Sequence, residues 1–156
     1  MAVGVLGFTV SCINDETALQ EEAAYVAEDG ISDYAMEDAD DLAGLAMVSD
    51  DGPSTGGKVT DGPRTITIND PRCNCENFSA VITIDPQSTP EVPRGEIVID
   101  FGEGCTGPLG NVRKGKIIIT FVGKRFLPGS TIVTTFDGYS INGIELEGVR
   151  TLTNVS

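Results

Sequence analysis

The sequence contains no histidine and no tryptophan, and only 10 of its 156 residues are Lys or Arg. Histidine is the commonest general base and zinc ligand, and it activates most Ser and Cys nucleophiles, so its absence removes those kinds of site. The net charge of −14 argues against a nucleic-acid partner, because phosphate binding needs clustered Lys and Arg. We therefore expect a protein that is not an enzyme and that uses no cofactor and no metal.

The acidic residues are concentrated in one part of the chain. Of the 24 Asp and Glu residues, 13 lie between Cys12 and Gly57, and this segment contains no Lys or Arg. The rest of the chain is nearly neutral, with 11 acidic and 10 basic residues. The stretch Ser49–Gly57 is rich in Gly, Ser and Pro, as flexible linkers are. These differences divide the chain into an acidic arm with its linker, residues 12–57, and a body, residues 58–156.

A run of small and apolar residues, Ala2–Ser11, precedes Cys12. It is too short to cross a bilayer as a helix, which needs about 20 residues, but it fits the hydrophobic region of a secretory signal. With Thr9-Val10-Ser11-Cys12 in the position of a lipobox, the chain resembles a bacterial lipoprotein. The resemblance implies that residues 1–11 are a signal-peptide remnant and that acylated Cys12 anchors the protein in the outer membrane or at the cell surface. The alternative for this run is a buried strand or a frayed start of the chain.

Helix-forming residues predominate in Asp15–Val48, where Ala, Leu, Glu and Met recur and Pro is absent. Asp29-Gly30 interrupts the pattern, so we expect two weak helices, or disorder, in place of one long helix. The acidic residues have no basic partner within the arm, and like charges repel. The apolar stripe is thin and rich in Ala, with Leu19, Val26, Leu42 and Leu45 as its larger members. We therefore favour an arm that acts as a charged spacer over one that docks on the body.

From residue 64 onward the hydrophobic period changes to two, and runs of Ile, Val, Thr and Phe alternate with clusters of Gly, Pro, Asn and Asp. The predicted strands are Arg64–Asn69, Phe78–Asp85, Glu96–Phe101, Lys116–Val122, Thr131–Phe136, Tyr139–Ile141 and Ile144–Thr153. Asn142-Gly143 provides the two positive φ angles that a type I′ hairpin needs. The expected fold is mostly β, an antiparallel sandwich or barrel-like sheet preceded by a weakly helical acidic arm.

Three segments of the body resemble a pattern in uncharacterised secreted lipoproteins of Bacteroidota, namely Glu96–Pro108, Arg113–Thr120 and Ile141–Thr151. The resemblance extends over residues 96–154 and brings no activity with it. It also implies truncation at the C-terminus, because such proteins run on past the position of Ser156. We therefore expect a cell-envelope lipoprotein whose β-domain binds a polysaccharide or protein ligand or has a structural role. The alternative is a fragment of a secreted hydrolase whose catalytic part lies beyond the C-terminus.

Three cysteines lie in the body, Cys73, Cys75 and Cys105. A structural zinc site needs four ligands, so this set is one short and no His completes it. In an exported protein we expect instead one disulfide, between Cys105 and either Cys73 or Cys75, with one thiol left free. The spacing does not decide between the two pairings.

Half of the basic residues surround one predicted strand, namely Arg113, Lys114, Lys116, Lys124 and Arg125. One interpretation is that they are solvated strand ends that discourage edge pairing. The other is a patch for an anionic partner, such as an acidic polysaccharide, lipid headgroups or the acidic arm itself. Paired carboxylates are abundant, but nothing in the sequence places two of them across a cleft, as glycoside hydrolysis requires.

Overall fold

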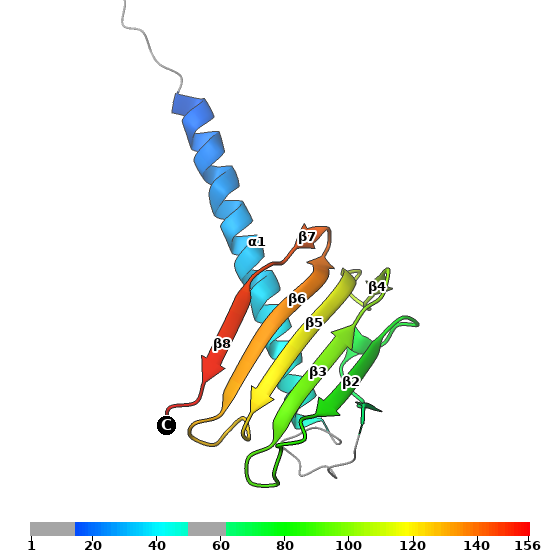
Figure 1. Ribbon diagram of the computed structural model, residues 1–156. Helices are drawn as coiled ribbons and strands as arrows, with labels where there is room; N and C mark the ends of the chain where they lie inside the picture. The colour runs from blue at the N-terminus through cyan, green and yellow to red at the C-terminus, as the bar shows by residue number, and fades with distance from the viewer. Residues whose placement is uncertain (1–14, 50–61) are drawn as a thin grey trace, which may run out of the picture. The chain divides into compact units, whose positions relative to one another are not determined.

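The computed structural model describes residues 15–49 and 62–156, and within them it contains one α-helix, one short 3-10 helix and eight strands. Their order along the chain is α1 (Asp15–Val48), β1 (Arg64–Thr65), η2 (Pro71–Cys73), β2 (Ser79–Ile84), β3 (Arg94–Asp100), β4 (Cys105–Thr106), β5 (Val112–Val122), β6 (Thr131–Ile141), β7 (Ile144–Glu145) and β8 (Val149–Thr153). All strand pairs are antiparallel and belong to one sheet (Figure 1), in which β1, β2, β3, β5, β6 and β7 are neighbours in that order. β4 pairs with β5, and β8 pairs with β6.

One face of the sheet, here called the inner face, is apolar and forms most of the core. In β3 and β5, Ile97 is paired with Ile119 and Ile99 with Ile117, and all four side chains are fully buried. Side chains alternate across a strand, so a period of two in the sequence places these residues on the same face. Burial of each such side chain contributes about 1.5–3 kcal/mol to the stability of the fold.

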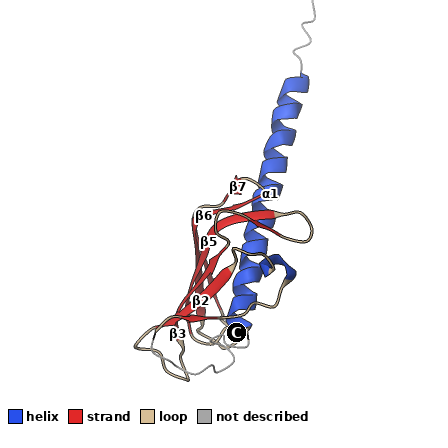
Figure 2. Cartoon of the chain, turned by 90° about the vertical axis from the view of Figure 1, so that its right-hand side faces the viewer, coloured by secondary structure: helices blue, strands red, loops and turns tan. Residues whose placement is uncertain are grey.

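The structure confirms a mostly β fold with an antiparallel sheet that follows a helical segment. The sheet is not closed. Segment Ser32–Val48 of α1 lies against its inner face (Figure 2), and the buried apolar residues of this segment belong to the same core cluster as those of the strands. Among the elements that the structure describes, none lies on the opposite face of the sheet.

Helix α1 runs without interruption from Asp15 to Val48, so the prediction of two helices separated at Asp29-Gly30 is wrong. A glycine inside a helix costs only about 1 kcal/mol, which the packing of the following turns offsets. The buried apolar residues of these turns are mostly small, namely Ala35, Ala39, Leu42, Ala43, Ala46 and Met47. Because alanines let a helix approach a sheet closely, the Ala-rich stripe that predicted a spacer is in fact a docking face.

The contacts divide the chain into two units, Met1–Ile31 and Ser32–Ser156. The second unit holds the whole sheet and the second half of α1, so the boundary lies inside the predicted arm and not at Gly57. Residues 32–48 are therefore part of the core of the β-domain. Cys12, the predicted signal segment 1–11 and most of the linker lie outside the described residues. Within the part that the structure describes, no helix is long and apolar enough to cross a membrane.

The hairpin between β6 and β7 is the one that the sequence predicts. Asn142 has φ 52° and Gly143 has φ 82°, as a type I′ turn requires. These two residues connect Ile141 to Ile144, which face each other across the ladder.

A β-bulge joins the two predicted strands 131–136 and 139–141 into the single strand β6. The register between β5 and β6 shifts at Gly115, because β6 has one residue more than β5 between the flanking pairs. The extra residue changes which side chains of β6 face inward. Before the bulge the even-numbered Thr134 is buried, whereas after it the odd-numbered Tyr139 and Ile141 are buried. The bulge thus turns Tyr139 toward α1.

Candidate functional site

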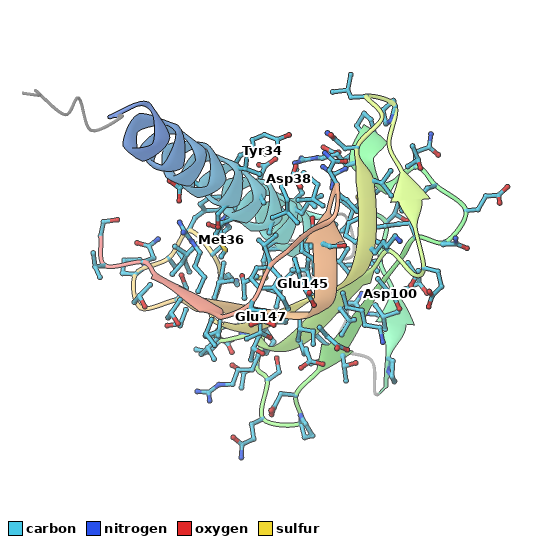
Figure 3. The ribbon with its side chains drawn as sticks, turned by 90° about the horizontal axis from the view of Figure 1, so that it is seen from above. Tyr34, Met36, Asp38, Asp100, Glu145 and Glu147 are labelled. Carbon is cyan, nitrogen blue, oxygen red and sulfur yellow. A yellow bond between two sulfur atoms is a disulfide. The ribbon has the colours of Figure 1, made fainter. Side chains whose placement is uncertain are left out.

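A buried ion pair joins Asp38 of α1 to Arg113 of β5. Asp38 lies on the side of α1 that faces the sheet (Figure 3). Arg113 is 1% exposed and Asp38 is 8% exposed. Nη2 of Arg113 donates to Oδ1 and Oδ2 of Asp38 at 2.9 and 3.0 Å, and Nε donates to Oδ2 at 3.2 Å. The planar guanidinium matches the carboxylate in this arrangement, so each buried charge is satisfied by the other.

The local sequence explains why both side chains point into the core. Arg113 precedes Ile117 and Ile119 by an even number of residues, so the alternation of β5 places it on the inner face. Asp38 lies three residues after Ala35 and four residues before Leu42, which places it in the buried stripe of α1. The ion pair therefore forms where the helix and the strand each have one charged residue in an apolar stripe.

Arg72 of η2 extends this pair into a network. Nη1 of Arg72 donates to Oδ1 of Asp38 at 3.1 Å, Nη2 donates to Oδ2 of Asp41 at 2.6 Å, and Nε donates to Oδ1 of Asp70 at 2.7 Å. Asp70 also caps η2, because Oδ1 accepts from the backbone N–H of Arg72 at 2.8 Å. The hydrogen bonds from Arg72 hold the pKa of Asp70 below its usual value, and those same bonds raise the pKa of Arg72. Both groups therefore stay charged.

A disulfide joins Cys75 to Cys105, which are 30 residues apart in sequence. Of the two pairings that the sequence left open, the structure has this one, and Cys73 is a buried free thiol. The disulfide links the segment after η2 to β4, which pairs with β5, and so keeps Arg72 near Arg113. Burial first, and then the charge of Asp70, raises the pKa of the Cys73 thiol to about 12. The thiol is therefore protonated at neutral pH and is a poor nucleophile.

Tyr139 contributes the large aromatic side chain of this region. It is fully buried, and its ring centroid lies 5.8 Å from the centroids of both Phe101 and Phe136. Burial, followed by the charge of Asp38, raises the pKa of Tyr139 to about 12. The phenol therefore remains neutral at physiological pH.

A further ion pair connects α1 to β8. The Oδ2 atom of Asp40 contacts Nε of Arg150. Burial raises the pKa of Asp40, and the charge of Arg150 opposes that shift. The second half of α1 is thus held to the sheet by carboxylates on two sides, through Asp38 and Asp40.

A cleft of about 650 Å³ opens beside the network. α1, η2 and the loop between β4 and β5 line most of it, and Arg72 and Arg113 form part of its wall. Three large apolar side chains of the cleft are exposed, Tyr34 at 53%, Leu109 at 90% and Leu152 at 41%. This volume and this mixture of apolar and polar groups are typical of a ligand-binding pocket.

The structure does not bring the five predicted basic residues together in one patch. Arg113 is buried against Asp38, and Nζ of Lys116 lies 3.9 Å from Oδ2 of Asp100. Lys114 is exposed near the start of β5, whereas Lys124 and Arg125 follow its end. At about 3.3 Å per residue, these two groups are roughly 30 Å apart. The arm was one of the anionic partners considered for the patch, and among these five residues it forms an ion pair with Arg113. The guanidinium of Arg125 also lies beside Gly44 of α1, where its charge acts to lower the pKa of Asp40.

Asp38, Asp40 and Arg72 are not among the site residues predicted from the sequence. The alternation of β5, counted back from Ile117, places Arg113 on the inner face, and the helical spacing places Asp38 in the apolar stripe of α1, but neither pattern pairs the two residues. The sequence contains no comparable signal for Arg72, because its position depends on the turn at η2 and on the disulfide.

The described residues contain no group of three or more Cys, Asp and Glu side chains placed to hold a metal ion. The charged side chains that gather here are arranged instead as ion pairs around Arg72 and Arg113. Comparison of the chain with protein-family models, with curated proteins and with solved structures found no match.

Proposed function

We propose that the protein is a lipid-anchored protein of the bacterial cell envelope, acylated at Cys12, and that its β-domain binds a partner without catalysing a reaction. The lipobox-like Thr9–Cys12 and the resemblance of the body to secreted lipoproteins of Bacteroidota support the anchor and a location at the outer membrane. Helix α1 begins at Asp15, three residues after Cys12. The acylated residue would thus be followed almost directly by the helix whose second half belongs to the β-domain.

The non-catalytic part of the proposal is carried by one observation, the pairing of the aspartate side chains of the cleft with arginine. Asp38, Asp41 and Asp70, which line the cleft, each accept hydrogen bonds from arginine, and Asp40 contacts Arg150. A general base or a nucleophile needs a pKa near the working pH and a group free to react. Asp38, Asp40 and Asp41 instead hold α1 against η2 and the sheet, which is a structural role.

The exposed part of the cleft supports a binding role. Tyr34 offers an aromatic ring and Leu109 an aliphatic side chain, and Glu37 is an exposed acidic neighbour that the structure places in no ion pair with a described residue. An aromatic ring beside polar groups suits a polysaccharide or an extended segment of a protein. We expect Tyr34→Ala and Leu109→Ser to reduce binding in a glycan and peptide array without changing the melting temperature.

The anchor is tested by fractionation. Expressed in a Gram-negative bacterium behind a complete lipoprotein signal, the wild type should incorporate labelled palmitate and sediment with membranes. Each buried CH₂ of an acyl chain contributes about 0.8 kcal/mol to membrane binding, so Cys12→Ser should leave the protein in the soluble fraction. Ser11→Ala is the matched control, because it keeps Cys12 and a small residue before it. Equal partitioning of the wild type and Cys12→Ser would overturn the proposal.

A further inference from the structure

Strand β8 forms an open edge of the sheet. It pairs with β6 on one side only, and all five of its residues are exposed. Exposed edges are usually protected by Pro, by Lys, by a bulge or by short length. β8 contains no Pro and no Lys, its five pairs with β6 are in continuous register, and its charged residue, Arg150, contacts Asp40. The opposite edge is different, because β1 has two residues and follows Pro63.

The register identifies the backbone groups that point away from the sheet. The backbone N–H of Asn154 donates to the carbonyl of Ser130 at 2.9 Å, so Asn154 points its backbone toward β6. In an antiparallel ladder, alternate residues point toward the partner and away from it. The N–H and C=O groups of Val149, Thr151 and Thr153 therefore point to the open edge, where no described strand pairs with them.

Apolar side chains gather along the same edge. Five of the ten exposed large hydrophobic residues of the described part lie on β8 or next to it, namely Phe126, Leu127, Val149, Leu152 and Val155. The loop that carries Phe126 and Leu127 is held beside β8, since Asn154 donates to the carbonyl of Arg125 at 3.3 Å and accepts from the N–H of Gly129 at 2.7 Å. Unpaired backbone groups and exposed apolar side chains together are typical of an interaction surface.

We propose that β8 pairs antiparallel with β8 of a second copy of this chain, centred on Thr151. In this register Thr151 faces Thr151 of the other copy and Val149 faces its Thr153, so the outward groups form roughly six main-chain hydrogen bonds. On the inner face Arg150 lies opposite Leu152 of the other copy, so no like charges are directly opposed. The pairs of β-branched residues on the other face are favourable across strands.

Charge and area both favour a second copy as the partner. Residues 124–156 contain three acidic and three basic residues and are neutral, and the charge of Arg150 on β8 is balanced by Asp40 of α1. Two such surfaces can therefore meet without strong repulsion. A five-residue strand alone buries less than the roughly 800 Å² per partner of a stable interface. Phe126, Leu127 and Val155 beside the strand supply further apolar area. Because the two copies are related by a two-fold axis, each copy contributes these three residues to the interface.

Sedimentation velocity on the full chain tests this proposal, with Cys12→Ser in every sample to prevent intermolecular disulfides. The reference chain should dimerise reversibly with a dissociation constant in roughly the micromolar range. Thr151→Pro removes an outward N–H but no hydrogen bond to β6, so it should weaken the dimer at least about tenfold. Thr151→Val keeps the N–H and is the matched control, which should dimerise like the reference. A reference chain that stays monomeric up to about 500 µM would overturn the proposal.

Substitutions that place opposite charges at Thr151 test the register of the pairing separately from the fold. Thr151→Lys and Thr151→Glu should each be monomeric, because like charges would face each other at the two-fold axis, and an equimolar mixture should form heterodimers. Circular dichroism and thermal melting should show that each variant is folded. Dimers that persist in Thr151→Lys alone, or a mixture that stays monomeric while both variants are folded, would contradict the pairing at Thr151.

Discussion

Asp38 and Arg113 determine how the helix and the sheet fit together, because each is buried with the other as its main partner. A buried ion pair adds little net stability, since desolvation offsets the attraction between the charges. Removing one partner is different, because the remaining charge stays buried without compensation. The pair therefore specifies the position of α1 on the sheet more than it strengthens the fold, and Arg72 reinforces that position from η2.

Asp38→Asn should lower the free energy of unfolding by about 3–5 kcal/mol at pH 7, because it leaves Arg113 buried without a counter-charge. Urea denaturation followed by circular dichroism measures this change. The matched control is Asp41→Asn, which removes a contact of Arg72 at a carboxylate that is 61% exposed. Exposed pairs contribute about 0–1 kcal/mol, so the control should be nearly neutral. Equal effects of the two substitutions would contradict a special role for Asp38.

Cys73 should make the fold sensitive to alkaline pH. Its pKa is raised to about 12 in the folded protein, whereas an unfolded thiol has a pKa of about 8.5. Between these values the unfolded state loses a proton that the folded state retains. The buried neutral thiol of Cys73 therefore stabilises the folded state fully below pH 8.5. This contribution to the free energy of unfolding is lost as the pH rises toward 12, at up to about 1.4 kcal/mol per pH unit.

The variant Cys73→Ala should show a flatter decline of stability between pH 8.5 and pH 10, measured as the urea midpoint at each pH. Over this range Tyr139 has little influence, because unfolded tyrosine ionises near pH 10. Iodoacetamide should also modify the Cys73 thiol slowly in the folded protein at pH 8 and rapidly in urea. Parallel pH profiles of the wild type and the variant would show that Cys73 is not the group responsible.

At the scale of single elements, the bulge between β5 and β6 depends on Gly115. Its φ of 73° is strained for residues with a side chain, and a Cβ atom there would collide with the backbone of Gly138. Gly115→Ala should therefore destabilise the protein by about 2 kcal/mol more than Gly110→Ala, measured by thermal denaturation. Gly110 has a similar φ of 81° but open space around it, so it isolates the effect of the collision. Similar melting temperatures for the two variants would show that the bulge can rearrange.

The elements that could be predicted from the sequence are those with a local signal. Alternating Ile residues predicted β3 and β5, and Asn142-Gly143 predicted the turn between β6 and β7. The bulge was missed because an extra residue in a strand resembles a break between two strands. The continuity of α1 through Gly30 was missed for a different reason. Helix propensity reports the local cost of glycine, whereas the packing that offsets it comes from the distant strands.

The site was less predictable than the fold, because it depends on contacts between residues far apart in sequence. Arg113 was interpreted either as a solvated strand end or as part of a patch for an anionic partner, because the predicted strand begins at Lys116. Strand β5 begins instead at Val112, which places Arg113 inside the strand. Its carboxylate partner, Asp38, lies 75 residues away in a segment interpreted as a spacer. The choice of Cys75 over Cys73 for the disulfide likewise depends on how η2 orients its neighbours.

At the scale of the whole molecule, the helix segment Ser32–Val48 is part of the β-domain, so the fold should depend on it. Chains of residues 32–156 and 62–156 distinguish this view from a β-domain that begins after the linker. The longer chain keeps the unit that the contacts define, and it should melt cooperatively at the temperature of the full protein. The shorter chain exposes the apolar inner face and leaves Arg113 without Asp38, so it should bind a hydrophobic dye, lose near-ultraviolet circular dichroism and aggregate.

Adding a synthetic peptide of residues 32–49 to the shorter chain should restore the near-ultraviolet signal, whereas the same peptide with Asp38→Asn and Leu42→Ala should not. A native-like, cooperative transition in residues 62–156 alone would show that the helix is dispensable for the sheet.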